Sequence, residues 1–404
     1  MYRCISELKG LIIDIDTFSE QSPTDWKDIA TEYKCIFLVT NENVARNFER
    51  TYGKDSVFEI EPFIKLFAPN QTIHQNALKL LKLAATEVAY VSKNRAFLDN
   101  AMSFLGGTIW VTEEVNYEDA GKAPDLICRG FESFKNVILK NVKGFLGEVS
   151  IYPNTEHIGM IIPLSFDVDG SDYSMHMLGR YFGYAHYMSQ LHPYSSAIFL
   201  NKNERGKAFG KYNDRFAVLY ACAVQRIQKS YSVDGIVSVP TRPGKVERFE
   251  PILETVSKTC GIQNWGANFK CITDYPTQKN LSSAERQENI GGVFQYNGDL
   301  TGKSVVLIDD IVTTGATIRE CIGVLRACGA AKISVVVLAI NQMQGYYWSS
   351  HIAQVTCDCC GERMHLLINS NNKNFFYSCY GCKNTKSFEV GMTELCHQVN
   401  DEMK

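Results

Sequence analysis

The sequence predicts an α/β protein built from parallel sheets whose short apolar strands alternate with helices. Two observations predict these sheets, and a third predicts a separate small module. In residues 1–125, apolar strand-like segments alternate with helical patterns, which is the order typical of parallel sheets. The unbroken apolar run from Val305 to Ile308 is followed by two acids, a threonine-rich loop and a helical pattern. Two Cys-x-x-Cys pairs near the C-terminus predict a small module stabilised by metal.

Length and charge limit what the protein can be. A chain of 404 residues is too long for one core, so we expect two or three domains. Its 41 basic and 44 acidic residues give a net charge of -3, which excludes a strongly basic protein that coats nucleic acid. No apolar run approaches the roughly 18 residues that span a bilayer. The first residues, MYRCISELKG, lack the apolar stretch of a secretory signal, so the cysteine-rich chain predicts a cytoplasmic protein.

The first 125 residues place acids at the end of their first strand. LKGLIIDIDTF predicts a strand followed by Asp14 and Asp16, and CIFLVTN predicts a second strand that ends in Thr40. A helix (TIHQNALKLLKLAA), a strand (EVAYVS), a helix (RAFLDNAMSFLGG) and a strand (TIWVT) follow. This order resembles the haloacid dehalogenase (HAD)-like phosphatases. The resemblance implies that Asp14 is the nucleophile, that Asp16 is the general acid/base, that Thr40 holds the phosphate, and that the two acids bind magnesium.

The second half of the HAD-like pattern departs from the family. The family places a lysine just before a helix, where this chain reads Ala68-Pro69, and a Gly-Asp-x-x-x-Asp run where it reads Ser92 to Arg95, followed by Leu98 and Asp99. A carboxylate nucleophile needs a metal and a cation to screen the incoming phosphate. We therefore expect a domain of reduced or regulatory activity, with an active phosphatase and an unrelated flavodoxin-like domain as alternatives. The candidate replacement cations are Lys79, Lys82 and Lys93.

The middle of the chain, residues 126 to about 232, carries little functional signal. NVILKNV, GEVSIYP and HIGMIIPL predict strands, whereas SMHMLGRYFGYAHYMSQ and DRFAVLYACAVQRIQKSY predict helices. His176, His186 and His192 are spaced ten and six residues apart, so they share no helical face and we expect separate histidines rather than a metal site. We expect the dense aromatic residues here to pack rather than to stack on bases; they are Tyr181, Phe182, Tyr184, Tyr187 and Tyr194.

The segment VVLIDDIVTTGATI, from Val305 to Ile318, carries the strongest signal. Its apolar run predicts a strand buried on both faces that stops at Asp309 and Asp310. The loop after the acids leads into RECIGVLRACGA, a helical pattern ended by Gly329. Free N–H groups and the positive end of the helix dipole then face a phosphate. The loop residues are Thr313, Thr314, Gly315, Ala316 and Thr317. The two acids are placed to hold sugar hydroxyls, directly or through a metal.

This segment resembles the signature of type I phosphoribosyltransferases, which bind 5-phosphoribosyl 1-diphosphate (PRPP) with Mg²⁺. The resemblance implies that Asp309 and Asp310 are catalytic and that the five loop residues bind PRPP. GIVSVPTRPGK predicts another strand, Ile236 to Val239, followed by the loop that binds the diphosphate in that family. The matching residues of this loop are Thr241, Arg242 and Lys245.

A long polar segment, YPTQKNLSSAERQENIGGVFQYN, resembles the ComF (competence protein) branch of the same family. The residues that carry this resemblance are Gln278, Leu281, Arg286, Asn289 and Phe294. In that branch the segment closes over PRPP, which implies that Arg286 or Lys279 reaches the leaving group. The chain departs from the family at Glu247 to Pro251, where an Arg-Gly-Phe-Asn-Gln run is common. The sequence therefore does not identify the residues that bind the acceptor.

The C-terminal residues predict a zinc site. Two knuckles on facing hairpins give tetrahedral thiolate coordination, and Gly361 suits the tight turn of the first knuckle. The four ligands are Cys357, Cys360, Cys379 and Cys382, while Cys359 is a bystander unless the pairing is shifted. The pattern resembles the zinc ribbons of type IA topoisomerases, with Met364 after the first knuckle and aromatic residues before the second. The lysines that imply a weak nucleic-acid contact are Lys373, Lys383 and Lys386.

The sequence thus predicts a HAD-like Rossmannoid domain at residues 1–125, a type I phosphoribosyltransferase domain at 126–345 with its core at 206–345, and a zinc ribbon at 346–404. We expect transfer of a phosphoribosyl group from PRPP to a small-molecule acceptor, with Mg²⁺ and Zn²⁺ as cofactors and no membrane contact. The sequence does not decide whether the protein catalyses the reverse phosphorolysis or whether it forms a homodimer. The alternatives are a PRPP-sensing regulatory protein without turnover that contacts nucleic acid, and a phosphatase only.

Overall fold

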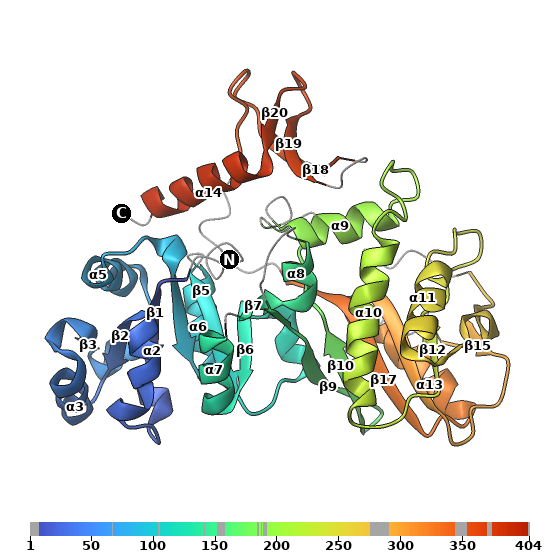
Figure 1. Ribbon diagram of the computed structural model, residues 1–404, viewed down its shortest axis with the longest axis horizontal. Helices are drawn as coiled ribbons and strands as arrows, with labels where there is room; N and C mark the ends of the chain where they lie inside the picture. Colours follow the sequence, from blue (N-terminus) through green and yellow to red (C-terminus); the bar gives the residue numbers. More distant parts are fainter. Residues whose placement is uncertain are drawn as a thin grey trace.

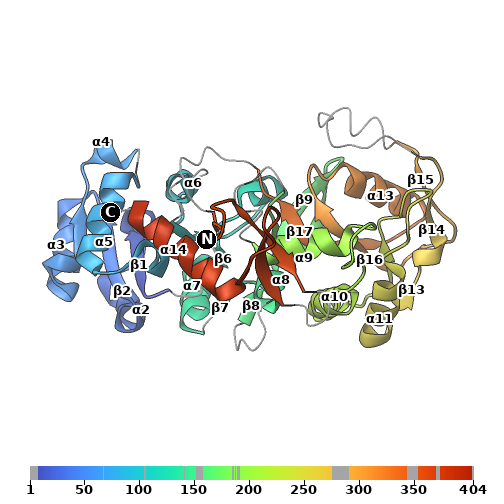
Figure 2. The ribbon, with the colours of Figure 1, turned by 90° about the horizontal axis from the view of Figure 1, so that it is seen from above.

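The protein is seen in a computed structural model that describes residues 8–66, 68–103, 106–140, 142–151, 158–183, 186, 188, 192–274, 291–343, 354–369 and 374–402. Two open sheets lie side by side along the long axis, and a small C-terminal sheet with one helix lies above them (Figure 1). Seen from above, this C-terminal part crosses the middle of the molecule (Figure 2).

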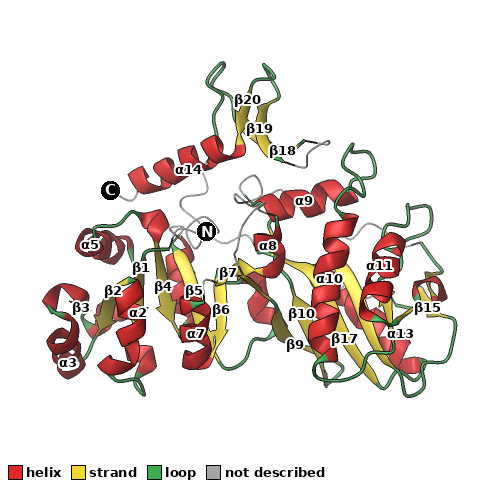
Figure 3. Cartoon of the chain, viewed as in Figure 1, coloured by secondary structure: helices red, strands yellow, loops and turns green. Residues whose placement is uncertain are grey.

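The first sheet has six parallel strands and helices on both faces (Figure 3). In spatial order its strands are β3 (Val57–Glu59), β2 (Lys34–Val39), β1 (Gly10–Asp14), β4 (Val88–Ser92), β5 (Gly107–Thr112) and β6 (Leu126–Arg129). One face packs against α2 (Lys27–Glu32), α3 (Glu42–Tyr52) and α7 (Gly130–Leu139), and the other against α5 (Gln71–Leu81) and α6 (Arg95–Ser103). The sheet therefore extends past the expected domain boundary at residue 125.

The second sheet is also mostly parallel, with an antiparallel hairpin at one edge. In spatial order its strands are β13 (Gln263–Asn264), β12 (Gly235–Ser238), β16 (Ser304–Val312), β17 (Lys332–Asn341), β10 (Ser171–Met177) and β9 (Ile162–Val168), and β11 (Arg180–Tyr181) extends the pairing of β17. One face carries α9 (Pro193–Lys202), α10 (Asn213–Gln228) and α11 (Glu250–Cys260), and the other carries α13 (Ala316–Ala327). Two short pairs flank this sheet, β7 (Val142–Phe145) with β8 (Ile158–Met160) and β14 (Phe269–Cys271) with β15 (Phe294–Tyr296).

The middle of the chain is where the expected elements are wrong. The NVIL segment ends helix α7, and GEVS lies in the short helix α8 (Leu146–Ser150). SMHM, expected in a helix, lies in strand β10. Because β10 has β17 on one side and β9 on the other, its methionines are buried inside a sheet. This tertiary burial overrides the helix propensity of methionine.

The two sheets share one apolar core, which includes Ile12 of β1 and Leu307 of β16. Main-chain hydrogen bonds also join the segment before β6 to the second sheet. Met343 N–H donates to the Gly121 carbonyl at 2.7 Å, and Ser165 N–H donates to the Val115 carbonyl at 3.0 Å. The first and second sheets are therefore packed as one body.

The C-terminal sheet has three antiparallel strands, β18 (Met364–Ile368), β19 (Phe375–Cys379) and β20 (Thr385–Ser387), followed by α14 (Phe388–Glu402). Strand β18 contacts α9 of the second sheet, while α14 contacts the 3-10 helix η4 (Ala85–Glu87) of the first. The C-terminal part thus touches both larger units. Among the described residues, no helix is long and apolar enough to cross a membrane.

Candidate functional site

The two acids of VVLIDDIVTTGATI lie on β16, which continues beyond them to Val312 instead of ending at the acids. Strand β17 stays paired with β16 as far as Val312, whereas β12 pairs with it only as far as Ile308. Asp309 and Asp310 therefore lie past the end of a neighbouring strand, at the carboxyl edge of the sheet. This edge is where open α/β sheets bind ligands.

The two acids have different surroundings. Asp310 is 8% exposed, with Arg248 Nη1 at 2.7 Å and Lys202 Nζ at 3.6 Å from its Oδ2 atom. Burial alone would raise the pKa of Asp310, but the charges of Arg248 and Lys202 hold it below its ordinary value. Burial raises the pKa of Asp309 to about 7, and the charge of Asp310 adds to this rise. Asp310 is thus ionised at neutral pH, while the pKa of Asp309 lies close to neutral pH.

Gly315 makes the turn from β16 into α13. Its φ angle of +77° is in the left-handed region, and a Cβ atom here would lie 2.8 Å from the ring of Phe166. Both conditions require glycine. The turn places Ala316 and Thr317 in the first turn of α13.

Two carbonyl groups of the loop accept hydrogen bonds from side chains. Tyr117 Oη donates to the Thr313 carbonyl at 2.7 Å, and Arg319 Nη1 donates to the Thr314 carbonyl at 2.7 Å. In a planar trans peptide, the C=O and the next N–H point in opposite directions. The N–H groups of Thr314 and Gly315 therefore point away from Tyr117 and Arg319, as an anion site at a helix N-terminus requires.

A cavity of about 500 Å³ joins this signature to the loop after β12. Asp309 and Thr317 line it together with Thr241, which lies on the loop after β12. The cations that line the cavity are Lys202, Arg205, Arg242, Lys245 and Arg248. The structure thus brings Thr241, Arg242 and Lys245 together with Asp309 and Thr317.

Three of these cations were not expected from the sequence. Lys202 and Arg205 lie at the end of α9 and just after it, in a region where no motif was found. Arg248 lies in the run Glu247 to Pro251, where the chain departs from the family pattern. The expected contributions of Arg286 and Lys279 concern residues outside the described part of the chain, which also omits Gln278, Leu281 and Asn289. Phe294 is buried in β15.

A second group of acids meets a lysine at the carboxyl edge of the first sheet. Asp14 is the last residue of β1 and is fully buried. Lys65, at the end of the short helix α4 (Pro62–Lys65), forms an ion pair with Asp14 and lies 3.3 Å from Asp16 Oδ2. Ser92 Oγ donates to Asp14 Oδ2 at 2.8 Å, and the Thr40 N–H donates to Asp16 Oδ1 at 3.1 Å. Asp14, Asp16 and Thr40 are therefore close together.

Lys65, three residues before Ala68-Pro69, is the lysine that contacts both acids. The candidates expected from the sequence were Lys79, Lys82 and Lys93 instead. Of the expected replacements, Lys93 pairs with Glu20 instead, and Lys82 ends α5 in a left-handed conformation. Lys65 ends the four-residue helix PFIK, just before α5. A helix this short shows no helical periodicity in the sequence, so it was not predicted.

The surroundings of Asp14 fit a lysine-balanced pair of acids better than a magnesium site. Asp99 pairs with Arg95 at 3.0 Å and Leu98 is fully buried, so neither joins Asp14. No group of three or more His, Cys, Asp or Glu ligands forms here among the described residues. Burial raises the pKa of Asp14 although the Lys65 charge opposes this rise. The ammonium group of Lys65 thus contacts both acids at the position that a magnesium ion would take.

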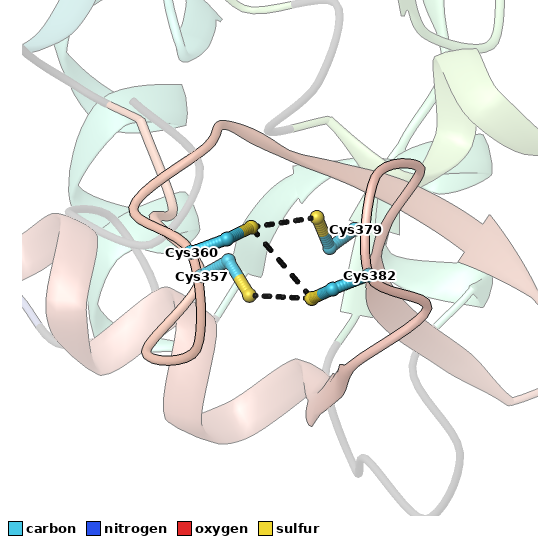
Figure 4. Close-up of side chains that lie close together, drawn as sticks. All are labelled: Cys357, Cys360, Cys379 and Cys382. Carbon is cyan, nitrogen blue, oxygen red and sulfur yellow. Dashed lines mark hydrogen bonds between the residues drawn. The ribbon is translucent and has the colours of Figure 1, made fainter.

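Four cysteines of the C-terminal sheet converge from two knuckles (Figure 4). Cys357 Sγ lies 3.4 Å from Cys382 Sγ, and Cys360 Sγ lies 3.5 Å from Cys379 Sγ and 3.6 Å from Cys382 Sγ. Tetrahedral zinc with Zn–S bonds of about 2.3 Å separates its sulfur ligands by about 3.8 Å. The four thiols therefore fit zinc. Cys359 is exposed and lies outside this cluster.

Three other groups of sequence candidates, namely the histidines, Tyr194 and Lys386, do not form metal or nucleic-acid sites in the part of the chain that the structure describes. His176, His186 and His192 are buried, and no metal cluster includes them. Tyr194 is buried and donates to the Leu338 carbonyl at 3.0 Å, which is a packing role. Lys386 lies 2.7 Å from Asp358 and 2.8 Å from Glu394, so it is not available to a nucleic-acid phosphate.

Comparison with known proteins points to the second sheet. Residues 270–360 match the family model described as "Phosphoribosyl transferase domain", a stretch that includes Asp309, Asp310 and the loop after them. No more than this part of the chain is covered by the match. It supports a phosphoribosyl transferase domain at the cavity just described.

Three curated relatives match the chain in part. It is 26% identical to the ribose-phosphate pyrophosphokinase of Thermoplasma volcanium, over 46% of this chain and 63% of the relative. It is 34% identical to the orotate phosphoribosyltransferase of Stenotrophomonas maltophilia over 17% and 31% of the two chains, and 30% identical to competence protein F of Haemophilus influenzae over 21% and 39%. The chain thus spans less than two thirds of each relative. These matches support a likeness to phosphoribosyltransferases and to the competence-protein branch.

Proposed function

We propose that the protein transfers a phosphoribosyl group from PRPP to an acceptor and releases diphosphate. The observation that carries this proposal is the cavity in which Asp309 and Thr317 face the cations of the loop after β12. A cavity with five cations suits a ligand that carries several phosphates. The match of residues 270–360 to a phosphoribosyl transferase domain supports the same conclusion.

Each side of the cavity has a role in this reaction. The N–H groups of Thr313 to Thr317 bind the 5-phosphate at the N-terminus of α13. Asp309 accepts hydrogen bonds from the ribose hydroxyls, and Arg248 holds the ionised Asp310 beside it. Arg242 and Lys245 face the diphosphate. Mg²⁺ bound with PRPP would screen the diphosphate, with Asp309 as an oxygen ligand of the kind it prefers.

The reaction follows from these charges. The bond between C1 of the ribose and the diphosphate oxygen breaks, and the diphosphate leaves with both electrons. Positive charge develops on the ribose, while negative charge develops on the leaving group beside Arg242 and Lys245. Fixed charges of this kind stabilise the transition state by several kcal/mol because they need no reorganisation. The acceptor lone pair then forms the new bond to C1.

Calorimetry of PRPP binding with Mg²⁺ tests the proposal. We expect Asp309→Asn and Asp310→Asn to weaken binding at least tenfold, and Asp214→Asn, which changes an exposed acid of α10, to leave it unchanged. Equal affinity in all four proteins would refute the pocket assignment. Release of diphosphate with a cell metabolite extract then separates an enzyme from a PRPP-sensing protein, which binds without turnover.

We also propose a phosphate-ester site at Asp14 as a second candidate function, of reduced or regulatory activity. The observation that favours it is Lys65, which contacts the acid that the HAD-like pattern makes the nucleophile. Such a site on one chain with the transferase suggests removal of the phosphate from the transferase product. Residual activity depends on Asp14 attacking phosphorus as the P–O bond to the ester breaks and the alcohol leaves, after which water hydrolyses the aspartyl phosphate. Lys65 alone screens the charge, so we expect the rate to be low.

Hydrolysis of p-nitrophenyl phosphate tests this second site. We expect Asp14→Asn to abolish any hydrolysis, whereas Asp310→Asn leaves it unchanged because Asp310 lies in the other sheet. If the two units act in sequence, the Asp14→Asn protein accumulates a phosphorylated product. An unchanged product after Asp14→Asn would contradict the coupling, and hydrolysis without diphosphate release would identify a phosphatase only.

A further inference from the structure

A cavity of about 800 Å³ lies at the edge of the second sheet where its parallel strands begin, opposite the edge that carries Asp309. The starts of β10 and β17 line it with Ser171 and Lys332, and α10 and α13 line it with Arg226 and Arg326 of their last turns. Pockets that bind small molecules have volumes of roughly 300–1,000 Å³. The cavity therefore has the size of a ligand site, and no described residue lines both it and the cavity beside Asp309.

The two cavities are separated along the strands. Lys332 pairs with Ser304, the first residue of β16, whereas Asp309 pairs with Val337, five residues further along β17. At about 3.3 Å per residue, these two levels of the sheet are about 16 Å apart. A small ligand in one cavity therefore leaves the other cavity accessible.

Three cations line the cavity at the start of the strands, namely Arg226, Arg326 and Lys332. In the part of the chain that the structure describes, none of them forms an ion pair. Asp172 is the one acid among the described lining residues, and it accepts a hydrogen bond from Ser165 Oγ. The lining thus carries an excess of positive charge, although the net charge of the whole chain is -3. Such an unbalanced group of cations favours an anionic ligand.

Two of the three cations are held in place by contacts with the protein. Arg226 Nη1 donates to the Ile161 carbonyl at 3.1 Å, and Lys332 Nζ lies 3.5 Å from the centroid of the Tyr231 ring. The Tyr231 hydroxyl lies 2.6 Å from Ser334 Oγ, so this ring is itself fixed against β17. Side chains that are already ordered lose less conformational entropy when a ligand binds. The remaining N–H groups of Arg226 and Lys332 are thus positioned for an anion before it arrives.

His176 shows that positive charges from both sheets converge on this cavity. Its ring lines the cavity from β10, with Nε2 at 3.1 Å from Ser174 Oγ. Burial, with the charges of Arg226 and Arg129, lowers the pKa of His176 to about 4. Arg129 ends β6 of the first sheet, and its Nη2 atom donates to the carbonyl of Pro163, another lining residue, at 2.8 Å. His176 is therefore neutral at pH 7, and an anion here offsets the charge of the surrounding cations.

We propose that this cavity binds a small organic phosphate, such as a sugar phosphate or a nucleotide, at a site separate from the one proposed for PRPP. Arg226, Arg326 and Lys332 bind the phosphate group, since hydrogen bonds from guanidinium and ammonium groups to phosphate oxygens are strong. A single phosphate fills only a small part of about 800 Å³, so the ligand also has an organic part. Ser171 and Ser230 line the cavity with hydroxyl groups that can bond this part. This site does not depend on the proposed transferase function.

Calorimetry on the full chain tests this site. The probes are ribose 5-phosphate, AMP, UMP and inorganic phosphate, with ribose and adenosine as uncharged controls. We expect at least one organic phosphate to bind more tightly than inorganic phosphate, and the uncharged controls not to bind. Arg226→Gln and Lys332→Gln should each weaken binding at least about tenfold, because each removes a charged hydrogen-bond donor. Lys229→Gln is the matched control, since Lys229 is an exposed cation that directly follows α10 and does not line the cavity.

A double variant separates this site from the cavity beside Asp309. Arg242→Gln combined with Lys245→Gln removes two cations of that larger group, and it should leave the affinity for the probe within twofold. Loss of binding in the double variant would place the probe in the other cavity and overturn the inference. Binding of none of the organic phosphates would also overturn it, as would equal affinities in the control and both cavity variants. Because Arg226 and Lys332 are exposed, their replacement should not unfold the protein, and circular dichroism checks this.

Discussion

Asp309 and Asp310 are neighbours in sequence, yet their side chains lie on opposite faces of the strand and have different surroundings. Successive side chains of a strand point to opposite faces. Val306 and Ile308 pack with the helices α9 to α11, so Asp310 faces that layer and meets Lys202 and Arg248. Asp309 faces the α13 side and lines the cavity. Asp309 is therefore the acid that lines the cavity, while Asp310 is held beside Lys202 and Arg248.

The raised pKa of Asp309 predicts a pH dependence of PRPP binding. With a pKa of about 7, Asp309 is protonated below that pH and loses the charge that accepts hydroxyl hydrogen bonds. Affinity should therefore fall as the pH decreases from 8 to 6, by up to about tenfold per unit below the pKa. Calorimetry over this range measures the effect. PRPP itself titrates near pH 6, so the contribution of Asp309 is the difference from Asp309→Asn. Parallel pH profiles for the two proteins would contradict it.

At the level of elements, the sequence predicted what is visible as a local pattern. Strands β1, β2, β4 and β5 were found because strands buried on both faces are apolar runs. Strand β10 was missed because its methionines and histidine have no such signature, and its burial depends on β17, which follows more than 150 residues later. Burial of Glu148 in α8 likewise depends on Arg180, at 2.9 Å.

The site was predictable to the same extent. Asp309, Asp310 and Gly315 follow each other in one motif, so their positions could be inferred together. Lys65 and Arg248 contact acids that lie 51 and 62 residues away in the chain. Nothing local indicates such a pairing, because only the fold brings these elements to the same sheet edge.

Gly315 is the position where one element depends most on one residue type. We expect Gly315→Ala to reduce the free energy of unfolding by about 1–3 kcal/mol, because alanine is strained at φ +77° and its Cβ would lie 2.8 Å from Phe166. The displaced start of α13 should also weaken PRPP binding at least tenfold. Urea unfolding and calorimetry measure the two effects.

The same helix offers a matched control in Gly323. It lies inside α13, and a Cβ atom there meets nothing within 4 Å. Gly323→Ala should therefore stabilise the protein by about 0.5–1 kcal/mol and leave PRPP binding unchanged. If both substitutions had the same effect on binding, the loop geometry at Gly315 would not matter for the ligand.

At the scale of the molecule, the C-terminal sheet depends on its thiol cluster. So small a sheet buries too little apolar surface to fold alone, so we propose that a metal held by the thiol cluster would supply its folding energy. We expect about one zinc per chain by elemental analysis, kept in Cys359→Ser and lost in Cys379→Ser. Loss of zinc should make residues 354–402 sensitive to proteases without changing PRPP affinity. Equal zinc content in the two variants would show that the cluster does not hold the metal.

The Tyr117 hydroxyl joins the first sheet to the loop of Thr313 to Thr317, which we propose binds PRPP and call the PRPP loop. Tyr117 lies in the 3-10 helix η5 (Tyr117–Lys122) before β6. Tyr117→Phe removes its hydrogen bond to the Thr313 carbonyl, a change of about 0.5–1.5 kcal/mol. Because this bond sets the direction of the Thr314 N–H, we expect PRPP affinity to fall about two- to tenfold.

Tyr33→Phe is the control for this effect. It removes a bond of the same kind, to the Ile138 carbonyl at 3.2 Å, but within the first unit. Its cost to the free energy of unfolding should be similar, while PRPP affinity stays unchanged. A difference between the two variants in calorimetry would mean that the first sheet holds the PRPP loop in its binding conformation. Equal affinities would mean that the two units are packed together without mechanical consequence for the ligand.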